Sequence, residues 1–121
     1  MDKVKYTAGV LILSGLFGSG CSTMEPPQAE FYQAKADVET ATAESASEFA
    51  ALAMHNAKEK IERAKKAMDA EEYPEAKRLA EQASADAQLA KVTAQTEKMK
   101  EALEEVNASL ETLKSELKVS S

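Results

Sequence analysis

The one cysteine of this 121-residue chain, Cys21, stands directly after an apolar stretch close to the N-terminus. A basic start with Lys3 and Lys5 precedes this stretch, and residues 6–20 contain no charged side chain. A basic start, an apolar segment and small residues before a processing site are typical of an export signal. A cysteine at that site adds a thiol that can carry a lipid. The pattern predicts cleavage between Gly20 and Cys21 and covalent lipid on Cys21.

The residues before the cysteine resemble the bacterial lipobox. Gly18, Ser19 and Gly20 are small and resist continuing a helix, which leaves the backbone open to a peptidase. The lipobox usually has Leu, Val or Ile where this chain has Gly18. The alternatives are an uncleaved membrane anchor, for which the stretch is short of the required 20 or so residues, and an ordinary signal peptide. The resemblance implies a bacterial envelope lipoprotein, and Ser22 fits sorting to the outer membrane, facing the periplasm.

Few other side chains suggest chemistry. His55 is the only histidine, so the chain cannot assemble a histidine cluster around a metal. Glu59 and Arg63 stand at i, i+4, as on a solvated helix face, and the acids in 71–75 suit the start of a helix. After residue 20 there is no glycine-rich phosphate loop. We therefore expect no catalytic residue, no metal and no cofactor apart from the lipid on Cys21.

The charge balance limits the classes of partner. Lysine and arginine total 15 against 21 acidic residues, which gives a net charge of −6. An acidic protein is a poor match for nucleic acid or for an anionic lipid surface. We expect membrane contact only through the lipid anchor and no nucleic-acid binding. Peptidoglycan contact is compatible with the envelope but has no motif to support it.

The composition after the cysteine predicts a single all-α domain. Residues 21–28 read as a tether because Pro26 and Pro27 favour an extended backbone. From 29 to 121 the chain is rich in Ala, Glu, Lys, Gln and Leu and has no glycine. We expect an antiparallel helical hairpin or three-helix bundle with a long C-terminal helix of coiled-coil character. Its helices should span about 27–44, 46–69 and 74–118.

Two signals divide these helices. Ser45 and Glu48 form a Ser-x-x-Glu capping box at the first break, although one continuous helix through this point is an alternative. Pro74 suits the first turn of a helix and predicts a tight turn before the last helix. Tyr73 should pack over this turn. Asp86, among the alanines of the last helix, either faces solvent or bonds to the first helix.

The apolar residues of the last expected helix are small in its first half and large in its second half. An alanine seam, on which helices can approach closely, consists of Ala76, Ala80, Ala83, Ala87, Ala90 and Ala94. A leucine seam follows at the same spacing of three and four residues and consists of Met99, Leu103, Val106, Leu110, Leu113 and Leu117. We expect the alanine seam to pack on the other two helices. The leucine seam should then form a homo-oligomer, bind a periplasmic protein partner or remain a frayed end.

Several stretches resemble one protein family. They are residues 50–61, Ala-Lys-Lys-Ala at 64–67, the turn Glu-Tyr-Pro-Glu-Ala at 72–76 and the Leu-Ala-x-x-Ala-x-x-Asp-Ala run within 78–90. From Glu30 to Ala94 the chain resembles the small envelope lipoproteins of domain of unknown function 4398. This resemblance implies a tetratricopeptide-like helical hairpin on the periplasmic side of an envelope membrane, with no known catalytic residues.

These observations lead to one functional expectation and two rivals. We expect a non-catalytic, outer-membrane-anchored lipoprotein with a structural or adaptor role in the cell envelope. The first rival is a tetratricopeptide-like module that binds a peptide or protein. The second is an enzyme or ligand carrier, which would need a polar pocket that alanine-packed helices leave little room for.

Overall fold

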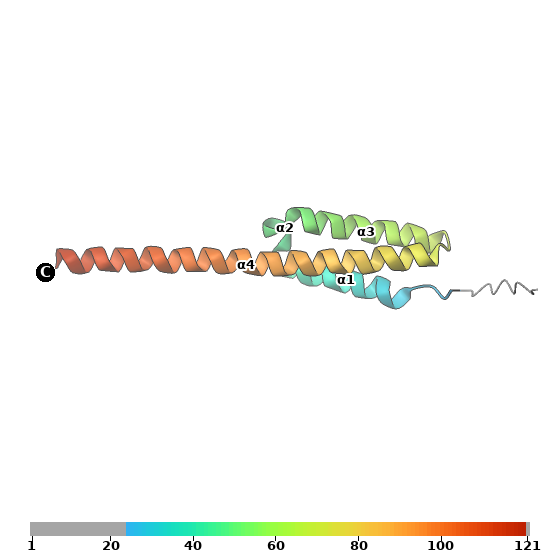
Figure 1. Ribbon diagram of the computed structural model, residues 1–121, viewed down its shortest axis with the longest axis horizontal. Coiled ribbons are helices and arrows are strands. Elements are labelled where there is room, and N and C mark those ends of the chain that lie inside the picture. Colours follow the sequence, from blue (N-terminus) through green and yellow to red (C-terminus); the bar gives the residue numbers. More distant parts are fainter. Residues whose placement is uncertain (1–23, 121) are drawn as a thin grey trace, which may run out of the picture.

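The computed structural model describes residues 24–120, and this part of the chain is built from α-helices without a strand (Figure 1). The cleavage and lipid positions Gly20 and Cys21 lie outside the described residues. The helices are α1 (Gln28–Ala43), α2 (Ala46–Phe49), α3 (Ala51–Asp69) and α4 (Tyr73–Val119). The all-α class and the long C-terminal helix packed against the others are confirmed.

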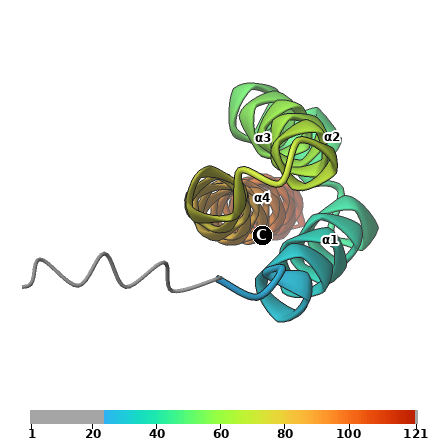
Figure 2. The same ribbon diagram turned by 90° about the vertical axis from the view of Figure 1, so that its right-hand side faces the viewer.

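The first half of α4 is the central element of the fold. Helices α1 and α3 lie side by side with it, and the view along the bundle shows the three in a triangle (Figure 2). Near the start of α4, Lys77 Nζ lies 2.9 Å from Glu30 of α1, and further along, Lys98 Nζ lies 3.7 Å from Glu44. Helix α1 is therefore parallel to α4, and α3 is antiparallel. The tether end of α1 thus lies beside the start of α4, and the C-terminal half of α4 points away from it (Figure 1).

The turn between α3 and α4 is closed by backbone hydrogen bonds. The amide of Glu72 donates to the carbonyl of Ala67 at 2.8 Å, and the amide of Glu71 donates to that of Met68 at 3.0 Å. This pair of bonds is a Schellman motif, which needs a left-handed residue directly after the helix cap. Glu71 takes that conformation with φ of 59°. Pro74 then occupies the first turn of α4, where its missing amide hydrogen has no cost.

The first break has a different cause from the predicted one. Ser45 takes a left-handed conformation, with φ of 64° and ψ of 25°, and its side chain makes no capping hydrogen bond. The predicted capping box with Glu48 is wrong because a capping serine needs an extended backbone. Instead, the amide of Ser45 closes the end of α1 by donating to the carbonyl of Thr42 at 3.0 Å.

The helix expected over 46–69 is divided in the structure. Ala50 leaves helical geometry, with φ of −139° and ψ of 45°, and separates the single turn of α2 from α3. The bend packs Phe49 and Ala50 against the buried cluster that contains Met54. Backbone bonds continue through it, because the Met54 amide donates to the Ala50 carbonyl at 3.1 Å. Burial of apolar side chains therefore offsets the interruption of the helix.

The core consists mainly of alanine. All six residues of the alanine seam are buried, and they meet buried alanines of α1 and α3 such as Ala34, Ala57 and Ala64. Met54 is the largest fully buried side chain among the described residues. Alanine has no side chain beyond Cβ, so the helix backbones can approach closely. The expected packing of the alanine seam on the other helices is confirmed.

A larger side chain in the alanine seam should force the helices apart. Ala87 is completely buried, so Ala87→Leu should lower the free energy of unfolding by about 1–3 kcal/mol, measured by urea denaturation. The matched control is Ala36→Leu, because Ala36 is exposed on α1. Equal effects of the two substitutions would contradict the packing described here.

The left-handed residue in the hairpin turn gives a second test. A side chain at Glu71 strains this conformation and glycine does not, so Glu71→Gly should raise the free energy of unfolding by about 0.5–1 kcal/mol. Glu72 has φ of −82°, so Glu72→Gly should lower the free energy of unfolding. Thermal unfolding of both variants compares the two turn positions, and a loss of stability in Glu71→Gly would refute the turn geometry.

Candidate functional site

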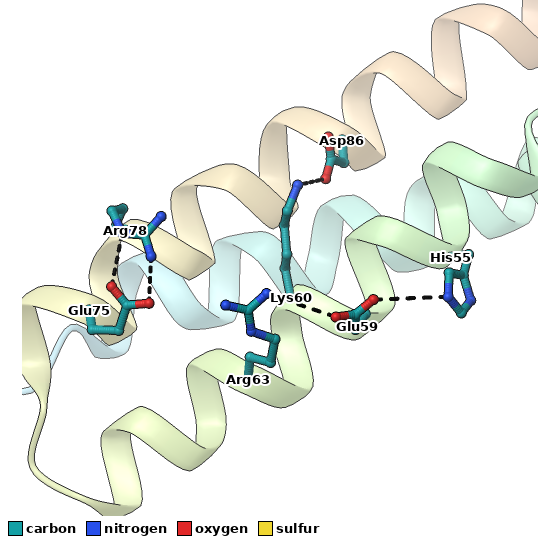
Figure 3. Close-up of polar contacts among 7 residues, drawn as sticks. All are labelled: His55, Glu59, Lys60, Arg63, Glu75, Arg78 and Asp86. Carbon is teal, nitrogen blue, oxygen red and sulfur yellow. Dashed lines mark hydrogen bonds and ion pairs between the residues drawn. The ribbon is translucent and has the colours of Figure 1, made fainter.

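The polar residues of α3 form a solvated row. His55, Glu59 and Arg63 lie in succession along α3 (Figure 3). His55 Nε2 lies 4.0 Å from Glu59, whose other oxygen lies 3.8 Å from Arg63 Nη1, and all three side chains are at least half exposed. The prediction of a solvated helix face is confirmed for Glu59 and Arg63. Between residues 24 and 120, no group of three or more His, Cys, Asp or Glu residues is arranged to hold a metal ion.

Asp86 of α4 pairs with Lys60 of α3. Lys60 of α3 reaches across to the Asp86 carboxylate on α4 (Figure 3). Each of the two side chains keeps about a quarter of its surface exposed, at 26% and 24%. Neither of the two expectations for Asp86, solvent or a bond to the first helix, is correct. The reason is the rotation of α4, which turns this residue toward α3 and leaves the α1 side to Ser84 and Gln88.

A polar network between α1 and α4 was not predicted from the sequence. Asp37 accepts hydrogen bonds from the Ser84 hydroxyl, from Gln88 Nε2 at 3.3 Å and from Gln33 Nε2 at 3.0 Å. Burial raises the pKa of the Asp37 carboxyl, but these hydrogen bonds outweigh it and hold the pKa below its ordinary value. The only sequence signal was the position of Ser84 and Gln88 beside the alanine seam. The network fixes the register of α1 along α4.

Two further ion pairs lie near the start of α4. Arg78 Nε donates to Glu75 at 2.9 Å, and this hydrogen bond lowers the pKa of Glu75 and raises that of Arg78 (Figure 3). The hydrogen bond between Lys77 and Glu30 likewise lowers the Glu30 pKa and raises the Lys77 pKa. Both pairs are exposed and contribute little to stability, since water screens them.

We call α1, α2, α3 and the part of α4 up to Lys98 the body, and the hollows described on it are open grooves. One of about 280 Å³ lies between α1 and α3, with Val38 and Ile61 at its floor and Lys35, Glu39, Lys58 and Glu62 around it. Another of about 490 Å³ is lined by residues 25–30 and Lys77 at the tether end. Both are open to solvent, and neither gathers the convergent polar groups that fix a small ligand.

The leucine seam lies on the projecting half of α4. Its six residues are between 49% and 67% exposed, and every residue from 99 to 119 is exposed. The last buried residue of α4 is Ala94, and Lys98, one turn further on, still pairs with Glu44 at the end of α1. Isolated exposed apolar residues are ordinary, whereas a continuous row of this length indicates an interaction surface. The seam is therefore the candidate functional site.

Two members of this apolar row were not recognised from the sequence. Leu89 and Val92 lie on α4 within the body, and they are 59% and 55% exposed. They continue the alternation of three and four residues backwards from Met99 through Thr96. The signal was present in the spacing, but it was hidden by the alanine seam, which occupies the same stretch of chain.

One protein family matches the chain over a stretch that includes α2, α3 and most of α1 and α4. Residues 29–106 match the model of a family described as a domain of unknown function, DUF4398. The chain belongs to the DUF4398 family. The match covers the body from residue 29 onward and continues into the exposed half of α4 as far as Val106, beyond the stretch from Glu30 to Ala94 that first suggested the resemblance. No curated protein and no solved structure matches the chain. Within residues 24–120 of this DUF4398 protein, no helix has the length and apolar character needed to cross a membrane.

The Asp37 network predicts a dependence of stability on pH. A carboxyl whose pKa is lower in the folded state stabilises the fold above its unfolded pKa of about 3.9, and this contribution is lost as pH falls through the folded pKa. Between pH 6 and strong acid, the free energy of unfolding of the wild type should therefore fall by more than that of Asp37→Asn. Urea denaturation at several pH values measures this, with Glu39→Gln on the same helix as the control. Parallel pH profiles for wild type and Asp37→Asn would contradict the network.

Proposed function

We propose that this DUF4398 protein is a lipoprotein of the bacterial cell envelope, held at the outer membrane by lipid on Cys21 and facing the periplasm. Its role is structural or that of an adaptor, without catalysis. The anchor is supported by the export-type N-terminus and by the small residues that lead to the lone cysteine. Two or three acyl chains, each contributing about 0.8 kcal/mol per buried methylene, hold a protein on a membrane durably.

The observation that carries a structural or adaptor role is the projecting half of α4. The 21 residues from 99 to 119 are all exposed, which at 1.5 Å per residue gives an extension of roughly 32 Å beyond the body. The described part of the tether, from residue 24 onward, lies at the opposite end of α4, so an anchored protein presents the leucine seam away from its membrane (Figure 1). Such a helix is suited to reach and hold another helix.

The chemistry of this projecting half supports binding rather than catalysis. The leucine seam is apolar, and the opposite side of the helix carries polar residues such as Glu101, Glu104 and Ser115. An amphipathic helix of this kind buries its apolar face against another helix. Catalysis needs acids, bases or nucleophiles held together in a site. The carboxylates of Asp86 and Glu30 are engaged in ion pairs between helices, and that of Glu75 is paired within α4.

A second candidate function is a tetratricopeptide-like module that binds a peptide. The groove between α1 and α3 favours it, because Val38 and Ile61 offer an apolar floor with lysines and glutamates at the rim. Its volume of about 280 Å³ accommodates only a few side chains. The leucine seam offers a far longer apolar surface and is the stronger candidate.

The anchor can be tested through its cysteine. In bacteria that express the full chain, Cys21→Ser should move the protein from the outer-membrane fraction to the soluble periplasmic fraction, because the variant has no thiol to acylate. Immunoblots of the separated fractions measure this, and Ser22→Ala serves as the control that keeps the thiol. Retention of Cys21→Ser in the outer-membrane fraction would refute the lipid anchor.

The binding role of the projecting helix can be tested separately. Leu110 is 49% exposed in the leucine seam, and Leu110→Glu should lower the apparent mass of the detergent-extracted full chain because a charge would be buried in the contact. Ser115→Glu adds the same charge on the opposite face and should leave the mass unchanged. Size-exclusion chromatography with light scattering measures both, and an unchanged mass for Leu110→Glu would refute association through this seam.

A further inference from the structure

Helix α4 carries two apolar faces. The exposed row of large residues follows a heptad repeat in which every member stands at position a or d. We call this row the outer seam; it consists of Leu89, Val92, Met99, Leu103, Val106, Leu110, Leu113 and Leu117. In the same heptads, the alanine seam occupies positions b and f. The long helix is therefore apolar on two sides where the two seams overlap, between Leu89 and Ala94.

The two faces point in nearly opposite directions. At 100° per residue, the centre of the a and d positions lies about 150° around the helix from the centre of the b and f positions. The body packs on b and f, and it leaves Leu89 and Val92 exposed at a and d. A further helix can therefore lie along the outer seam beside the body without colliding with α1 or α3, which share one side of α4 (Figure 2).

The outer seam is long enough for a specific contact. It runs from Leu89 to Leu117, which is roughly 42 Å at 1.5 Å per residue. A large apolar side chain buries roughly 60–120 Å². Eight such side chains, each about half to two-thirds exposed, give roughly 300–550 Å² per copy. With the flanking residues of two copies included, the contact reaches about 1,000 Å², the size that specific interfaces need.

We propose that copies of this chain associate through the outer seam as a parallel, in-register coiled coil, with the helical bodies on the outside. The partner of the seam is thus another copy of the same chain. The proposal goes beyond the proposed function by naming the partner and its orientation, and the orientation rests on the lipid anchor of that function.

The position of the tether determines the relative direction of the α4 helices in associated copies. Glu30, at the start of α1, is paired with Lys77, at the start of α4, so the tether and the start of α4 lie at the same end. When all copies are anchored in one membrane, their α4 helices all point away from it. Helices that associate under this constraint are parallel.

The residues that flank the outer seam are compatible with this arrangement. In a parallel coiled coil each g position faces the e position of the next heptad in the other helix. Gln95 then faces Lys100 of a second copy, and Ser109 faces Lys114, so no like charges meet in these pairs. Thr96 stands at a central a position, and its hydroxyl donates to the carbonyl of Val92 at 2.9 Å. Its burial therefore leaves no unsatisfied donor.

Cysteine cross-linking of the full chain in membranes tests the proposal. The variants are Leu89→Cys and Leu113→Cys, which stand roughly 36 Å apart along α4. A parallel, in-register pair brings each new thiol next to its own counterpart, within the Cβ separation that a disulfide needs. Ala108→Cys, at an outward f position of the exposed half, is the matched control. Non-reducing gels of oxidised membranes should show about tenfold more disulfide dimer for each seam variant than for the control.

The outcomes distinguish a failure of the coiled-coil proposal from a failure of the lipid-anchor proposal. Dimers at both seam positions support it. Dimers at neither position, at only one of them, or equally at Ala108→Cys overturn it, because an antiparallel or staggered pair brings at most one position next to itself. The intact mass of the wild-type chain from the same membranes reports acylation independently. A mass without acyl chains refutes the lipid anchor, while the cross-links still decide whether the chain associates with itself.

Discussion

Close contact between helix backbones, which alanine permits, determines the rest of this structure. The body has few large side chains to bury, so its helices gain contact by approaching one another. The approach requires a continuous row of small residues on α4, and the alanine seam supplies it as far as Ala94. Polar contacts such as those of Asp37 with Ser84 and of Lys60 with Asp86 then fix how the helices slide and rotate against each other. A thin apolar core of this kind makes the fold sensitive to added volume.

The same helix encodes both where the body ends and where a new contact begins. After Ala94, the positions that face the body are taken over by Glu97, Glu101 and Glu104, which a packed helix could not bury. On the other side, large apolar residues begin at Leu89, before the body ends, and continue to Leu117. One helix thus connects an intramolecular interface to an exposed one. Association would bury the exposed seam, and it would add apolar contact that the alanine-rich body lacks.

The sequence predicted the elements well and their mutual rotation poorly. Local signals such as the absence of glycine after the tether and Pro74 in its turn were sufficient to predict the helices and the hairpin, because helix propensity and capping act over a few residues. The left-handed Ser45 and the bend at Ala50 were missed because they depend on how Phe49 packs against distant residues. The partner of Asp86 required the rotation of α4 relative to α3. The six residues of the leucine seam lie on the exposed half of α4, yet the spacing alone did not show that the row begins beside the body.

Hydrogen exchange of the full chain in its membrane tests most directly whether the exposed half of α4 is held by association. An isolated helix end opens readily, whereas a helix in a coiled coil opens only when the contact is lost. The amides of residues 97–118 should exchange as slowly as those of 76–94, and Leu110→Glu should accelerate exchange in 97–118 alone. Rapid exchange throughout 97–118 in the wild type would contradict the account, since the outer seam would then be a frayed end.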